Sequence, residues 1–128
     1  MRGITKLYLE NNVLANAEVD LEVRRNEIHA LVGENGAGKT TLMKILYGLE
    51  RADRGTIELE GQAVRIGSPL EANRLGIGMV HQHFRLIPDF TIAENVVLGI
   101  EPVRRGLFLD REGALAAVRS VIQEFGFS

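Results

Sequence analysis

Gly33-Glu34-Asn35-Gly36-Ala37-Gly38-Lys39-Thr40 is the stretch that decides the fold of this 128-residue chain. It fits the pattern G-x-x-x-x-G-K-[ST] of the phosphate-binding loop called Walker A. Its glycines let successive backbone N–H groups turn inward around a phosphate, a path that a Cβ atom would obstruct. A helix that starts directly after the loop adds the partial positive charge of its N-terminus. The segment therefore predicts a binding site for a nucleoside triphosphate.

The side chains that follow the last glycine complete this predicted site. Lys39 is expected to reach the β- and γ-phosphates as a point charge. The Thr40 hydroxyl is expected to hold Mg²⁺, and Thr41 lies one residue deeper in the first turn, where it can donate toward the α-phosphate. The loop itself is expected to contribute Gly33, Asn35, Gly36, Ala37 and Gly38. The predicted ligands are therefore a nucleoside triphosphate and Mg²⁺.

The sequence on both sides of the loop has the order that such a site needs. Residues 28–32, Ile-His-Ala-Leu-Val, are nearly all apolar, which predicts a strand covered on both faces. After the loop, apolar residues recur at the spacing of one helix face and predict a helix over 39–49. A simple turn would not need these glycines followed by Lys-Thr, because ordering such a loop is costly in conformational entropy.

The remaining elements are predicted from alternation and capping signals. Residues 13–24 and 77–81 have strand patterns, and residues 57–66 have the pattern of a hairpin. Three further helices are each preceded by a capping side chain, and the last has a stop signal at Gly126. The three N-cap residues are Ser68, Thr91 and Asp110.

Composition narrows the class of protein. The chain is 45% hydrophobic and 25% charged with a formal net charge of −2, which fits one globular domain without a polybasic arm for nucleic acid. It has no cysteine, so disulfides and thiolate metal sites are excluded. Its apolar runs are far shorter than the roughly 20 residues that cross a bilayer, and no secretory signal is expected.

Several segments resemble the ATPases of the ATP-binding-cassette (ABC) family. Residues 31–49 resemble the Walker A region of that family, residues 55–61 its hairpin, and residues 78–84 its Q-loop. Residues 86–99 resemble the start of its helical subdomain, so the similarity covers essentially the whole chain. The segment His81-Gln82-His83-Phe84 most resembles ATPase subunits of bacterial importers for nucleosides or simple sugars, in which two cassettes are fused.

The resemblance implies an α/β fold of the P-loop NTPase class, a truncated ABC-type nucleotide-binding domain. It would comprise an antiparallel β subdomain, an incomplete parallel core sheet and the start of a helical subdomain. Residues 1–90 would hold the β subdomain, the P-loop and the Q-loop strand. Residues 91–128 would start the helical subdomain.

The resemblance also assigns roles to residues outside the loop. Tyr8 lies where the family has an aromatic residue that stacks on adenine, and Ala15 where a small apolar residue lies beneath the base. The alternative for Tyr8 is that it covers the edge of the sheet. Gln82 matches the Q-loop glutamine, the one catalytic-site residue expected here, which ligates Mg²⁺ or orients the attacking water.

The partners that the resemblance implies are transmembrane permease subunits and a second nucleotide-binding domain, at the cytoplasmic face of the inner membrane. No nucleic acid is expected. Phe84, Leu86, Ile87 and Phe90 either line the groove that receives a helix of the membrane subunit or pack the helical subdomain.

The family's signature segment, Walker B strand and switch histidine are expected after residue 128. We therefore expect nucleotide binding without turnover, and unpaired edges at residues 28–32 and 77–81 that favour self-association or segment exchange. Two alternatives stay open. The chain is a non-catalytic nucleotide-binding or self-associating module, or it is the cassette of an ABC protein of DNA repair or translation.

Overall fold

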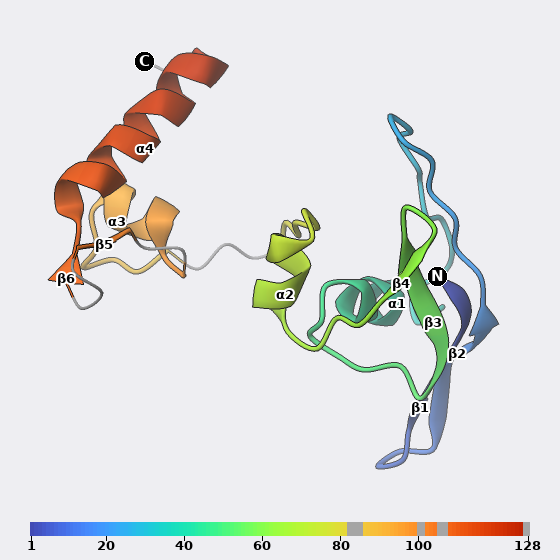
Figure 1. Cartoon of the computed structure of the whole chain (residues 1–128). Coiled ribbons are helices and arrows are strands. Elements are labelled where there is room, and N and C mark those ends of the chain that lie inside the picture. Colours follow the sequence, from blue (N-terminus) through green and yellow to red (C-terminus); the bar gives the residue numbers. More distant parts are fainter. Residues whose placement is uncertain (82–85, 100–101, 105–107, 127–128) are drawn as a thin grey trace. The chain divides into compact units, whose positions relative to one another are not determined.

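A computed structural model describes residues 1–81, 86–99, 102–104 and 108–126 of the chain. The chain divides into two compact units, Met1–Val80 and His81–Ser128 (Figure 1). The boundary between residues 90 and 91 that the sequence suggests stays a prediction. No helix in the described part is long and apolar enough to cross a membrane.

The first unit is built on a four-stranded antiparallel sheet with the order β2-β1-β3-β4. Its strands are β1 (Arg2–Tyr8), β2 (Val13–Val19), β3 (Arg54–Leu59) and β4 (Gln62–Val64). The predicted hairpin is confirmed by the pairing of β3 with β4. Its turn residues Glu60 and Gly61 both have left-handed backbones, with φ of 51° and 79°, as two-residue hairpin turns require.

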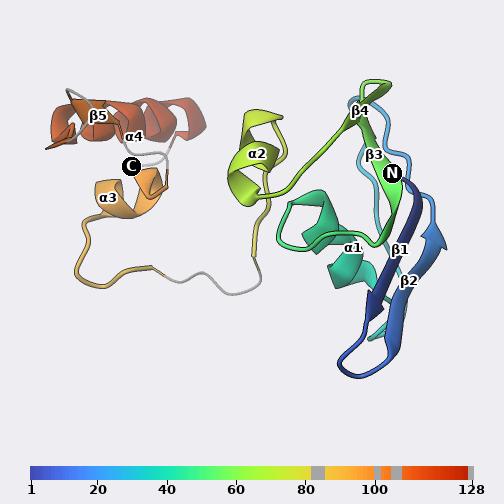
Figure 2. The same ribbon diagram turned by 60° about the horizontal axis from the view of Figure 1, so that its bottom comes forward.

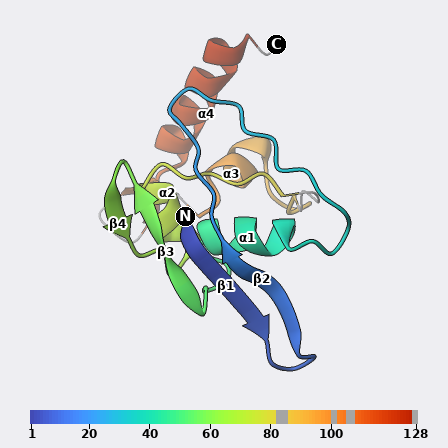
Figure 3. The ribbon, with the colours of Figure 1, turned by 90° about the vertical axis from the view of Figure 1, so that its right-hand side faces the viewer.

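Helix α1 (Lys39–Leu46) packs on one face of this sheet, as Figures 2 and 3 show from two sides. Their shared core consists of Met1, Ile4, Leu42 and Ile45, all at most 9% exposed. The predicted helix start is confirmed, but the helix ends before residue 49. Gly48 has a φ of 76°, and the Leu49 N–H donates to the Lys44 carbonyl at 2.9 Å, which closes the helix end.

Helix α2 (Pro69–Arg74) and helix α3 (Ile92–Val97) begin where their caps predict. The Ser68 hydroxyl accepts from the Glu71 N–H, and Thr91 and Glu94 form a reciprocal capping box. Helix α4 (Arg111–Phe125) begins after Asp110 and ends at Gly126, also as predicted.

The second unit contains α3 and α4, which pack through small apolar residues. This core consists of Ala93, Val97, Ala114 and Val118. Two short strands, β5 (Val103–Arg104) and β6 (Phe108–Leu109), follow α3 and precede α4 along the chain and pair antiparallel with each other.

The two predicted core strands, residues 28–32 and 77–81, are wrong for this structure. Neither forms a strand, and Ile28, Val32 and Val80 are 100%, 89% and 80% exposed. A parallel strand exists only when neighbouring strands take its N–H and C=O groups, and none of the described strands pairs with these segments. The strand predicted over 13–24 likewise ends at Val19. The antiparallel part of the predicted fold is thus present, whereas the described residues do not form the parallel part.

Candidate phosphate-binding site

The loop of residues 33–38 leads directly into α1. Gly36 and Gly38 have φ of 86° and 81°, a left-handed region that a residue with a Cβ atom enters only at a cost. Gly38 is the N-cap of α1, and its carbonyl accepts from the Leu42 N–H at 2.9 Å. The free N–H groups of the first helical turn therefore open onto the loop, which favours an anion there.

Lys39 closes this loop with its side chain. Its ammonium donates to the Gly33 carbonyl at 2.7 Å and to the Glu34 carbonyl at 2.8 Å. Lysine has three N–H donors, so these two contacts leave one for another acceptor. The arrangement fixes a positive charge beside the N-terminus of α1, where both fields attract a phosphate.

Asn16 on β2 is a residue of this site that sequence reasoning missed. Its side chain is buried, and its amide nitrogen donates to the Gly38 carbonyl at 3.3 Å. Its oxygen is buried without a hydrogen-bond partner among the described residues. An amide within the alternating pattern of a predicted strand is the signal that could have pointed to it.

Strand β2 lies so close to the loop that only glycine fits at position 38. A Cβ atom on Gly38 would lie 2.1 Å from the Ala15 carbonyl oxygen and 2.7 Å from the Asn16 amide nitrogen. The structure thus brings Ala15, predicted to lie beneath the base, against the end of the phosphate loop. Position 38 needs glycine both for its backbone angle and for its packing.

We expect Asn16→Asp to destabilise the chain by about 3 kcal/mol at pH 7. The substitution keeps the shape but replaces the donor with a buried carboxylate that faces the Gly38 carbonyl. Burial raises the pKa of the new carboxyl, so the loss should shrink as the pH falls and the acid becomes protonated. Urea unfolding at pH 7 and pH 5 measures both effects.

The matched control is Asn11→Asp, the same change at an exposed position of the turn between β1 and β2. It should alter the free energy of unfolding by less than about 0.5 kcal/mol. Equal effects of the two substitutions would contradict the placement of Asn16 against the loop.

Tyr8 lies at the end of β1, beside α1. Its hydroxyl donates to the Glu50 carboxylate and lies 3.5 Å from the Thr41 hydroxyl. The Lys6 ammonium lies over one face of its ring, 5.5 Å from the centroid. Tyr8 precedes the loop in the sequence and Thr41 follows it. The structure therefore brings two of the predicted site residues together.

The Glu50 carboxylate contacts both Tyr8 and Lys44. The Lys44 ammonium lies 3.2 Å from its carboxylate, and the Glu50 side chain is 19% exposed. Burial opposes ionisation of Glu50, but the hydrogen bonds from Tyr8 and Lys44 outweigh it and hold the pKa of the carboxyl below its ordinary value. The same hydrogen bond to Glu50 raises the pKa of the Tyr8 phenol.

The other predicted residues are distributed as follows. Thr40 and Thr41 lie in the first turn of α1, and Gly33, Asn35 and Ala37 lie in the loop, where the Ala37 N–H donates to the Glu34 carbonyl at 3.2 Å. Gln82 lies outside the described residues, as does Phe84.

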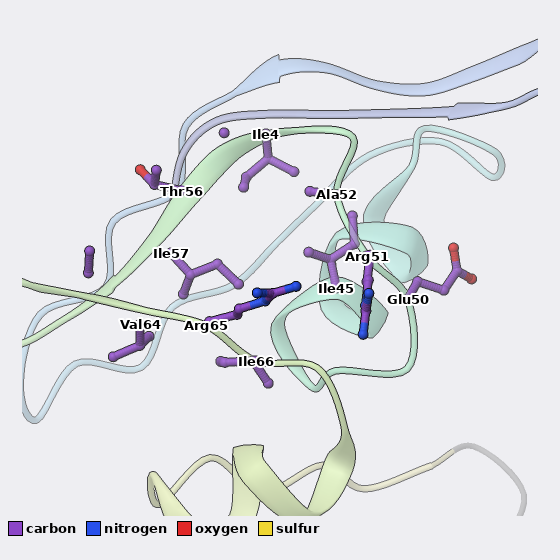
Figure 4. Close-up of a pocket in the computed structure, with 12 residues that line it drawn as sticks. Ile4, Ile45, Glu50, Arg51, Ala52, Thr56, Ile57, Val64, Arg65 and Ile66 are labelled. Atoms are coloured by element: carbon purple, nitrogen blue, oxygen red, sulfur yellow. The ribbon is translucent and has the colours of Figure 1, made fainter.

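A separate pocket of about 440 Å³ lies between the end of α1 and the β3–β4 hairpin (Figure 4). Its apolar lining includes Ile45, Ile57 and Ile66. Glu50 stands at its margin with the carboxylate directed away from Ile57. This carboxylate is thus turned out of the pocket.

A left-handed glycine loop, a lysine folded onto its carbonyls and a helix that begins at its last glycine define a P-loop protein. The family model described as ABC transporter matches residues 17–128. The chain therefore belongs to the ABC transporter family, and the resemblance and the P-loop fold class expected from the sequence are confirmed.

Relatives of this family are similar over most of the chain. It is 51% identical over 114 residues to the guanosine import ATP-binding protein NupO of Bacillus subtilis, covering 89% of this chain and 22% of that protein. It is 60% identical over 99 residues to the glucose import ATP-binding protein TsgD13 of Haloferax volcanii, covering 77% and 18%. It is 45% identical over 128 residues to the nucleoside import ATP-binding protein NupA of Lactococcus lactis, covering 100% and 25%. The chain thus spans a quarter or less of the length of these relatives.

Proposed function

We propose that this chain binds ATP with Mg²⁺ at residues 33–41. The observation that carries the proposal is the Lys39 ammonium held on the Gly33 and Glu34 carbonyls beside the N-terminus of α1. The amides of the helix start, the left-handed glycines and this cation are the groups that a triphosphate requires. The family membership supports the same ligand.

Within this proposal each predicted residue has one role. Lys39 binds the β- and γ-phosphates, Thr41 donates to the α-phosphate, and Thr40 holds Mg²⁺. Tyr8 stacks on the base. Ala15 lies beneath the base, and Gln82 completes the Mg²⁺ shell or orients water.

For the whole protein we propose an ATPase that powers import of nucleosides or simple sugars. The printed names of the relatives, which include guanosine, glucose and nucleoside importers, support this substrate class. Permease subunits and a second nucleotide-binding domain would be its partners at the cytoplasmic face of the membrane. Hydrolysis is proposed for that assembly, and nucleotide binding for this chain.

One surface supports the proposed permease contact. Leu86, Ile87 and Phe90 line an apolar pocket of about 290 Å³ beside α3, and Leu86 is 74% exposed. An apolar groove of this kind suits a short amphipathic helix of a membrane subunit. The alternative, packing within the helical subdomain, would bury the same side chains.

A second proposal, self-association, is favoured by a different observation. Ile28, Val32 and Val80 are large apolar side chains that are at least 80% exposed. Where such side chains form one patch they mark an interaction surface, and the proposal is that a second copy of the chain covers them. Light scattering tests this proposal, because a dimeric mass that is lost on Ile28→Asp substitution is expected.

The nucleotide proposal is tested by calorimetric titration of the chain with Mg²⁺-ATP. We expect saturable binding that Lys39→Ala weakens by about 10- to 100-fold, the contribution of one charge-assisted hydrogen bond. Arg25→Ala, which removes an exposed charge outside the loop, is the control and should bind like the unaltered chain. Equal binding by the Lys39 variant would contradict the proposal.

A further inference from the structure

We infer that Glu50 is a positioning residue that holds the Tyr8 ring in place for the base of the nucleotide. The inference rests on the proposed nucleotide site and adds a residue that lies outside the loop. Its basis is one carboxylate that accepts from the Tyr8 hydroxyl and from Lys44 at 3.2 Å.

The backbone that follows α1 fixes the place of Glu50. The Leu49 and Glu50 N–H groups both donate to the Lys44 carbonyl, at 2.9 and 3.3 Å. This turn depends on Gly48, where an added Cβ atom would lie 2.7 Å from the Ser68 backbone. The backbone therefore turns back after α1 and places Glu50 beside the last turn of the helix. Figure 4 shows its side chain directed out of the neighbouring pocket.

The charges around Glu50 keep it ionised. Lys44 is its direct ion-pair partner, and Lys6 adds a second positive field while pairing with Asp53 at 3.7 Å. An ionised carboxylate is an acceptor only, so the phenol proton of Tyr8 is committed to it. Without nucleotide, this leaves the phenol oxygen to accept from Thr41; the single Thr41 proton would turn to the α-phosphate when ATP binds.

These contacts restrict the ring itself. One ring face is covered by the Lys6 ammonium at 5.5 Å, and the hydroxyl is tied at the other end. A base would then stack on the opposite face. The hydroxyl lies 3.5 Å from Thr41, the residue proposed to contact the α-phosphate. Through its hydrogen bond to Tyr8, Glu50 thus holds together the end of β1, which would contact the base, and the first turn of α1, which would contact the phosphate.

A ring already held in one orientation loses less conformational freedom when a ligand binds. Releasing it should therefore weaken the binding of a ligand that has a base and leave a ligand without one unaffected. We expect Glu50→Ala to weaken ATP binding by about 5- to 10-fold, within the usual cost of immobilising a side chain. Binding of inorganic triphosphate should change by less than about 2-fold, because it has no base to stack.

The contact itself can be measured without nucleotide. The chain has two tyrosines and no tryptophan, so a Tyr47→Phe background leaves Tyr8 as its only phenol. In an ultraviolet titration the phenol should ionise at higher pH with Glu50 present than in Glu50→Gln, and at the lowest pH in Glu50→Ala. Glu58→Gln, at an exposed position of β3, is the matched control and should leave the titration unchanged.

Binding is then measured for Tyr8→Phe, Glu50→Ala and the double variant, with ATP and with inorganic triphosphate. Tyr8→Phe keeps the ring but removes its donor. If Glu50 acts through Tyr8, the double variant should be no weaker than either single variant. Additive losses, or an equal loss for triphosphate, would overturn the inference.

The two proposals fail in different ways. Absence of ATP binding by the unaltered chain, or binding unaffected by Lys39→Ala, overturns the nucleotide proposal and with it the role of Glu50. If the unaltered chain binds ATP normally but Glu50→Ala does not shift the pH at which the Tyr8 phenol ionises, only the inference about Glu50 is overturned. The neutral variant Glu50→Gln keeps the acceptor and the side-chain volume, so it separates loss of the contact from loss of folding.

Discussion

Gly38→Ala should abolish ATP binding and lower the free energy of unfolding by about 3 kcal/mol or more, whereas Gly36→Ala should cost only about 1 to 2 kcal/mol. Both glycines have left-handed backbones, with φ of 81° and 86°, so both substitutions carry the same conformational cost. The two positions differ in the room that is available for an added Cβ atom. A Cβ atom on Gly38 would lie 2.1 Å from the Ala15 carbonyl oxygen, but one on Gly36 meets no atom within 4 Å.

The clash at position 38 cannot be relieved by a side-chain rotation, because the atom it meets belongs to the backbone of β2. Either β2 leaves α1 or the loop opens, and both separate Asn16 from the Gly38 carbonyl. Urea unfolding gives the stability difference, and calorimetric titration with Mg²⁺-ATP gives the binding. Equal stability of the two variants would show that β2 does not lie against the loop.

Features encoded within a few neighbouring residues could be predicted from the sequence. The capping pairs at Ser68 and Thr91 and the stop at Gly126 all define helix ends in the structure. The loop and the start of α1 are of the same kind, since a glycine loop ahead of an amphipathic run specifies its own geometry. Each of these signals lies within one short, continuous stretch of the sequence.

Features that depend on distant partners could not be predicted. The apolar run at 28–32 has the composition of a buried strand, but a strand also needs a neighbour to take its backbone hydrogen bonds. The composition of residues 28–32 indicates a preference for a buried strand, but it does not show whether a neighbouring strand is present. In the described residues the neighbour is absent, and Ile28 is fully exposed.

The site residues that the sequence did not point to have the same explanation. Asn16 meets the loop across a separation of 22 residues, and Glu50 meets Tyr8 across 42. A single asparagine or glutamate has no local pattern that names its partner. Their contacts follow from the packing of α1 on the sheet, which the amphipathic face of the helix implies only in outline.

Ile45→Ala should be the most destabilising of the core substitutions, with a loss of about 2 to 5 kcal/mol. Ile45 is 1% exposed and joins α1 to Ile4 on β1, so truncation leaves a cavity between helix and sheet. A unit of this size has a total stability of only several kcal/mol, so most of it should be lost. The core of α3 and α4 contains none of these residues and should keep its structure. Amide spectra recorded during urea unfolding follow both units in one sample.

The sharpest control for this experiment is the same substitution at Ile28, which is 100% exposed. At a protein concentration low enough for the chain to be monomeric, Ile28 buries nothing, and its removal should change the free energy of unfolding by less than about 0.5 kcal/mol. The comparison therefore tests the core and the missing strand together. If Ile28→Ala destabilised the chain as much as Ile45→Ala, residues 28–32 would be packed in solution. The segment ahead of the phosphate loop would then have found the partner that a buried strand requires.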